Sequence, residues 1–231
     1  MNPYPDFPLS MALQNYMPVV LSGLGLFWVA RMISAAHPAA GRLALAGFAL
    51  IVTAGALKAT WKLVMATARL DIPLLSQSLF PLIAPGFSLT AWALFWSKRN
   101  PGRALVWWPP VFVSAAALLG ALALSVTRTD RAWVFVLIGL STIGNVGLAG
   151  LLIHSALQRG SHLAAVLFAL NLLITFALSG IAGMPNKPLE VHWTEQIIST
   201  VSNLGFAWAA WMMTQSRPAL RSLTAQKSHA A

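Results

Sequence analysis

Seven apolar stretches follow one another along the chain, separated by short polar segments. They lie at 11–35, 41–68, 72–97, 104–127, 132–158, 162–184 and 190–216. A helix needs about 20 mainly apolar residues to cross the hydrocarbon core of a bilayer, and each stretch is long enough. The pattern therefore predicts an all-α, polytopic membrane protein with seven transmembrane helices. Residues 1–10 and 217–231 are expected to form exposed tails.

The composition agrees with a chain that lies almost wholly in the bilayer. Of the 231 residues, 58% are hydrophobic and 9% are charged, whereas a soluble domain carries about 25% charged residues. No cysteine is present, which excludes disulfides and thiolate metal sites. The formal net charge of +10 does not indicate nucleic-acid binding, because most lysines and arginines lie at the ends of the predicted spans.

The basic residues also predict an orientation. If the N-terminus is outside, nine lysines and arginines fall on the inner side and four on the outer side. Because cytoplasmic loops are enriched in basic residues, we expect the N-terminus outside and the C-terminus in the cytoplasm. The N-terminal segment lacks the positive region of a cleaved signal peptide. Both features fit a bacterial inner membrane.

An internal repeat is visible at an offset of 119 residues. This shift aligns residues 86–92 (GFSLTAW) with residues 205–211 (GFAWAAW), and it pairs Gly25 with Gly144. One offset that serves several segments favours a duplication. It divides the chain into a first three-helix bundle (11–97), a linker helix (104–127) and a second bundle (132–216).

One intervening span gives the two bundles the same orientation, which defines a parallel repeat of the 3+1+3 type. This layout resembles the topology of the SWEET sugar facilitators, the PQ-loop proteins and the vitamin transporters of the PnuC type. The resemblance implies a solute path between the two bundles. It is one of topology, because the chain has no Pro-Gln dipeptide and no proline in the fifth span.

Polar residues recur at helical spacing in the last predicted spans. Asn171 and Thr175 are four residues apart, and Glu195, Ser199 and Asn203 share one helix face. Polar side chains are costly in lipid, so these stripes should face other helices or a wet cavity. Asn145, Asn171 and Asn203 all fall near the membrane midplane, where transporter sites lie. The alternative for each asparagine is simple helix packing, worth about 1 kcal/mol.

Charged residues mark the outer part of the predicted bundle. Lys58 and Lys62 are one turn apart in the second span, and the few acids expected on the same side are Asp71, Glu190 and Glu195. They could form a gate, of which a Lys58–Glu195 pair is one version, or the lysines could simply snorkel to the interface. Asp71, which precedes Ile72 and Pro73, is also expected to cap a helix.

These observations lead to a functional hypothesis. We expect a transporter or facilitator for a small polar or amphipathic solute, with alternating access between the two bundles. Its candidate substrate-binding residues are Asn145, Asn171, Thr175, Ser199, Asn203, Gln77 and Gln196, and its candidate gate consists of Lys58, Lys62, Asp71 and Glu195. The alternative is a membrane sensor or an accessory subunit that binds a ligand or a partner helix in the same cavity.

Enzymatic activity is the weaker expectation, because no nucleophile–base pair can be named from the sequence and no phosphate-loop or dinucleotide motif occurs in it. We expect neither a cofactor nor a metal ion. The expected partners are the lipid bilayer, a small-molecule ligand and a second copy of the chain in a homodimer, and no nucleic acid.

Overall fold

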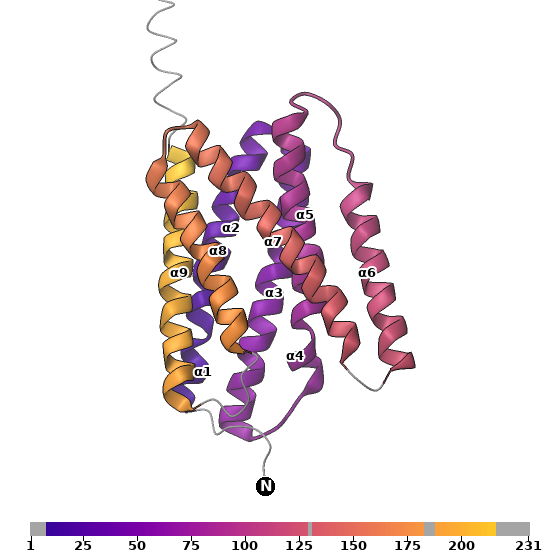
Figure 1. The fold of residues 1–231 in the computed structure, drawn as a ribbon, viewed down its shortest axis with the longest axis vertical. Coiled ribbons are helices and arrows are strands. Elements are labelled where there is room, and N and C mark those ends of the chain that lie inside the picture. The colour runs from indigo at the N-terminus through magenta and orange to yellow at the C-terminus, as the bar shows by residue number, and fades with distance from the viewer. Residues whose placement is uncertain (1–7, 129–130, 183–187, 216–231) are drawn as a thin grey trace, which may run out of the picture.

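The computed structural model describes residues 8–128, 131–182 and 188–215, and the regular structure in these ranges is entirely α-helical. The helices are α1 (Leu9–Gln14), α2 (Tyr16–Ala36), α3 (Pro38–Ala68), α4 (Pro73–Gln77), α5 (Leu79–Arg99), α6 (Trp108–Thr127), α7 (Ala132–Gln158), α8 (His162–Ala182) and α9 (Leu189–Gln215). The long helices stand side by side (Figure 1). The predicted all-α fold is confirmed.

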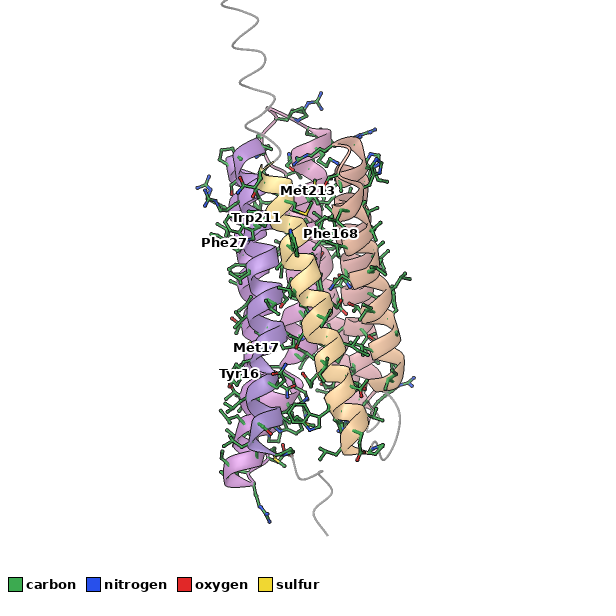
Figure 2. All side chains as sticks on the ribbon, turned by 90° about the vertical axis from the view of Figure 1, so that its left-hand side faces the viewer. Tyr16, Met17, Phe27, Phe168, Trp211 and Met213 are labelled. Carbon is green, nitrogen blue, oxygen red and sulfur yellow. The ribbon has the colours of Figure 1, made fainter. Side chains whose placement is uncertain are left out.

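Six helical segments of the described chain are long and apolar enough to cross a membrane. They are Leu9–Ala36, Pro38–Ala68, Pro73–Arg99, Trp108–Thr127, Ala132–Gln158 and His162–Ile181. These six helices indicate an integral membrane protein in a lipid bilayer. The seventh predicted span corresponds to α9, which has 27 residues but carries acids and amides that lower its hydropathy. Figure 2 shows α9 between α2 and α8, with Tyr16 and Met213 toward opposite ends of the bundle.

Six of the helices form a closed ring. In order around it, α2 packs on α3, α3 on α5, α5 on α7, α7 on α8, α8 on α9, and α9 on α2. α6 lies outside the ring, against α5 and α7 (Figure 1). The main apolar core draws residues from all six ring helices. The centre of the ring is therefore the part of the molecule that every long helix except α6 helps to shape.

The turn between α2 and α3 is fixed by His37. Its Nδ1 accepts a hydrogen bond from the backbone N–H of Ala40 at 3.2 Å, which caps the N-terminus of α3. The proton of the ring therefore lies on Nε2, which donates to the carbonyl oxygen of Arg103 at 2.8 Å. Pro38 occupies the first turn, where a helix needs no N–H donor. α3 consequently begins at Pro38, three residues before the predicted start at 41.

Two predicted spans are interrupted near their N-terminal ends. The first divides at Asn15 into α1 and α2, and the third divides at Ser78 into α4 and α5. Asp71 does not cap a helix: Ile72 is the N-cap residue of α4 and makes no capping bond through its side chain. The prediction was wrong because the Asp71 carboxylate serves another partner, accepting a hydrogen bond from Trp61 Nε1 at 2.8 Å.

α3 and α5 approach each other closely at a pair of glycines. A Cβ placed on Gly47 would lie 2.6 Å from the carbonyl oxygen of Gly86, and a Cβ on Gly86 would lie 2.9 Å from that of Gly47. Small residues at such crossings let membrane helices bring their backbones together. The buried Thr90 hydroxyl also lies at this crossing, where a Cβ on Gly47 would overlap it, and it donates within α5 to the Gly86 carbonyl at 2.9 Å.

Replacing Gly47 with alanine is expected to lower the free energy of unfolding by about 1–3 kcal/mol, because a backbone carbonyl blocks the added methyl group. Gly120→Ala in α6 is the control, since its Cβ would meet nothing within 4 Å. That change should stabilise the helix by about 1 kcal/mol. Thermal unfolding in detergent measures both, and equal stability of the two variants would contradict the close crossing.

Candidate solute site

A cavity of about 160 Å³ lies inside the ring, and all six ring helices contribute to its lining. Its polar lining residues are Ser22, Asn145, Asn171, Thr175 and Asn203. The rest of the lining is apolar and includes the rings of Phe87, Phe168 and Phe206. The three asparagines that the sequence places at one depth, on three different helices, therefore surround a single cavity.

The three asparagines differ in their hydrogen bonds. Asn171 Nδ2 donates from α8 to α9, to the carbonyl oxygen of Ser202 at 3.2 Å and to its hydroxyl at 2.8 Å. Asn203 Nδ2 donates within its own helix, to the carbonyl oxygen of Ser199 at 2.8 Å. The Asn145 side chain makes no hydrogen bond within the part of the chain that is described. Of the three, Asn171 alone links two helices.

Of the other predicted binding residues, some line the central cavity and others lie elsewhere. Thr175 lines the cavity, and Ser199 supports it indirectly by accepting the Asn203 amide. Gln77 lines a different space, nearer the end of the bundle. Gln196 is not a lining residue of the central cavity; its carbonyl oxygen accepts a hydrogen bond from Thr200. Ser22, Phe87 and Phe206 escaped the sequence-based selection, although the offset of 119 residues pairs Ser22 with Ser141 and Phe87 with Phe206.

A larger vestibule of about 1070 Å³ lies among the ends of α3, α4, α5, α6, α7 and α9, toward the lower end of the bundle in Figure 1. Its charged lining residues are Lys58, Lys62, Arg128, Arg131 and Glu195, with His192 beside them. Three of the four predicted gate residues thus line one space. The two arginines were missed because the sequence identifies them only as charges between two spans.

The gate residues have these neighbours. The Lys58 ammonium group lies 4.1 Å from the centre of the Trp61 ring, a cation–π contact, and 3.5 Å from the carbonyl oxygen of Ser76. Lys62 Nζ donates to Asn15 Oδ1 at 2.7 Å. Glu195 lies 3.6 Å from the His192 ring. Asp71 contributes indirectly: its carboxylate accepts a hydrogen bond from the Trp61 indole and so holds the ring that Lys58 contacts.

A pocket of about 240 Å³ lies toward the opposite end of the bundle; it is called the inner pocket because the sequence predicts this end to be cytoplasmic. It contains Lys98, whose Nζ donates to the Ser155 hydroxyl at 2.6 Å, and Arg159, which donates to the Met213 carbonyl at 2.8 Å. Apolar side chains separate this pocket from the central cavity. Ile33 lines the pocket and Leu152 lines the cavity, and each is 1% exposed.

Comparison with known proteins gives no relative: no protein-family model, no curated protein and no solved structure matches the chain. Within the described ranges, no three side chains of the types His, Cys, Asp or Glu come together as ligands for a metal ion. The side chains that line the three spaces are therefore the basis for assigning a function.

The hydrogen bonds predict different stabilities for two cavity variants. Asn171→Leu should lower the free energy of unfolding by about 0.5–2 kcal/mol, since it removes a bond between helices. Asn145→Leu should leave stability unchanged or raise it, because it breaks no bond and adds apolar contact in the cavity. Thermal unfolding in detergent provides the comparison. Equal losses in both variants would mean that Asn145 has a structural partner.

Proposed function

We propose that this protein is a small membrane transporter or facilitator for a small polar solute. The observation that carries the proposal is a cavity with five polar lining residues inside an apolar helix ring, with a further space toward each end. The three spaces follow one another along α7: Ile138 lines the vestibule, Asn145 the central cavity, and Ser155 the inner pocket. A purely structural bundle has no need of such a series, since polar groups in a bilayer are costly.

Two helix contacts support the hypothesis of two repeated bundles. A Cβ on Gly25 would overlap the Phe206 ring and lie 3.2 Å from Ala207 Cα. A Cβ on Gly144 would lie 2.9 Å from Phe87 Cβ and 3.0 Å from Ser88 N. A shift of 119 residues converts the first contact into the second, residue by residue.

These two contacts lie where the proposed bundles meet. The Gly25 contact joins α2 to α9 and the Gly144 contact joins α5 to α7, which are the two places where the ring passes from one bundle to the other. A two-fold axis along the membrane normal relates two such contacts in a parallel repeat. The pattern supports a carrier in which one bundle rocks against the other along these contacts.

The barrier on the inner side follows the same symmetry. Val29 and Leu148 are repeat-related, as are Ile33 and Leu152, and these four side chains are at most 2% exposed. They belong to one apolar cluster. A carrier would open this barrier in its second state, when the two bundles change their relative angle.

The same barrier favours the second candidate function. A sensor or accessory subunit would bind its ligand in the central cavity and keep the inner side closed. Passage of a solute separates the two functions: a carrier moves solute across a bilayer, and a sensor of this kind binds it without moving it.

Blocking the cavity is expected to abolish transport. Ala149 lines the cavity, so Ala149→Phe should reduce solute flux into reconstituted liposomes by at least about tenfold by filling the site. The neighbouring position supplies the control, because a Cβ on Gly150 would meet nothing within 4 Å and Gly150→Phe should retain the flux. Glycerol, 3-aminopropane-1,2-diol and pyruvate serve as probes, with light scattering as the readout.

Flux of no probe above that of protein-free liposomes would reject the carrier in favour of the sensor. Equal flux through both variants would place the path outside the cavity. Gel filtration of each variant establishes that it is folded. If Ala149→Phe does not fold, Asn145→Phe is the second variant that fills the cavity. Asn145 makes no hydrogen bond within the described chain, so its replacement breaks none.

A further inference from the structure

Both hydroxyl groups that line the central cavity donate their protons to backbone carbonyl oxygens. Ser22 Oγ donates to the carbonyl oxygen of Val19 at 3.1 Å, and Thr175 Oγ1 donates to that of Asn171 at 2.8 Å. A hydroxyl has a single proton to donate and two lone pairs that accept. Both side chains therefore offer the cavity acceptors and no donor.

Two of the asparagine amides are oriented in the same sense. The Nδ2 groups of Asn171 and Asn203 bond to the backbone carbonyls of Ser202 and Ser199, and each also reaches the hydroxyl of that serine, at 2.8 and 3.4 Å. Because a carbonyl oxygen only accepts, these contacts fix which end of each amide is nitrogen. The nitrogen end of each amide is thus held against its serine, with a single short bond in the case of Asn203, and the Oδ1 oxygens remain as acceptors.

Asn145 is the exception among the five polar lining residues. Its amide makes no hydrogen bond within the described chain, so it can turn either its oxygen or its nitrogen toward a solute. No charged side chain is among the described residues that line the cavity. The cavity thus presents four acceptor groups, one adaptable amide and no formal charge.

This arrangement selects against ions of both signs. An anion brings only acceptors, which would face the lone pairs of four side chains without a compensating donor or cation. A cation would find acceptors but no carboxylate in the cavity, and on the vestibule side it would pass four basic residues, Lys58, Lys62, Arg128 and Arg131, against one acid, Glu195. A neutral solute that donates hydrogen bonds satisfies the acceptors and avoids both costs.

The volume of the cavity limits the solute further. An apolar cavity of about 150 Å³ holds one benzene molecule, which has six non-hydrogen atoms. The central cavity, at about 160 Å³, is of the same size. Its phenylalanine rings supply flat apolar walls for the carbon atoms of a solute.

We propose that the central cavity binds an uncharged small polyol, of about the size of glycerol, through hydrogen bonds that the solute donates. The inference names the substrate class of the proposed carrier, and it rests on that function in treating the cavity as a solute site. Its chemical content is the direction of the hydrogen bonds, which binding measurements can test without any transport.

The test compares three probes of similar size on the purified protein. Glycerol is a neutral donor, 3-aminopropane-1,2-diol is a cationic donor, and pyruvate is an anion that only accepts. Binding is measured by saturation-transfer nuclear magnetic resonance in detergent, with competition between the probes. Glycerol is expected to bind best and pyruvate not at all.

A pair of variants tests the role of the hydroxyl acceptor. Thr175→Val removes one acceptor at constant shape and should weaken glycerol binding by about threefold to tenfold. Thr67→Val is the matched control, because the Thr67 hydroxyl also donates to a carbonyl one turn back, at 2.8 Å, but does not line the cavity. Thr67→Val should leave the affinity unchanged.

Liposome flux with the same probes separates the two proposals. Glycerol binding that depends on Thr175 but occurs without flux would uphold the inference and reject the carrier. Pyruvate or the cation binding as well as glycerol would overturn the inference whatever the flux. The absence of binding by every probe, or equal affinities in Thr175→Val and the wild type, would also overturn it.

Discussion

A polar side chain inside a bilayer has to find its hydrogen-bond partners within the protein, and the structure depends on how this chain meets that requirement. The hydroxyls of Ser22 and Thr175 donate to carbonyls of their own helices. The amide of Asn171 donates to the next helix, and that of Asn203 to its own. Each of these bonds satisfies a donor and leaves an oxygen that can still accept, and all four residues line the space in the ring.

The helices of the ring that surrounds this space meet through small residues. Gly47 and Gly86 bring α3 against α5, while Gly25 and Gly144 accept the Phe206 and Phe87 segments of the facing helices. The phenylalanines on those segments also line the cavity. The residues that close the ring therefore help to shape its interior, so that helix packing and the cavity are parts of one arrangement.

Hydropathy was sufficient to predict most of the fold. The span at 132–158 coincides with α7, and the other ends differ by a few residues where local hydrogen bonds decide them, as at His37 and Pro38. Hydropathy did not register the helix break at Ser78, although the sequence carries a local signal for it: the polar residues 76–78 and then Pro81, which has no N–H for a bond to the Gln77 carbonyl. α9 had to be recognised from its length, since its polar face lowers its mean hydropathy.

Part of the candidate site was also predictable. Counting residues from the ends of the predicted spans placed Asn145, Asn171 and Asn203 at the same depth in the membrane, and they line one cavity. The sequence could not indicate the direction of their hydrogen bonds, because that depends on which carbonyl lies opposite each amide. It could not separate Gln77, which lines the vestibule, from the cavity residues, because depth along a helix does not say which space a side chain enters.

The central claim is that a water-accessible polar space exists in the middle of the helix ring. Since the chain has no cysteine, single cysteines report on it without background. A thiol reacts with polar reagents only where water supports the thiolate. Asn145→Cys should therefore react with a small hydrophilic thiol reagent in proteoliposomes. Val146→Cys, at a neighbouring position that is 41% exposed on the bundle surface, should not react. Failure of the cysteine at 145 to react, in a folded protein, would contradict the claim.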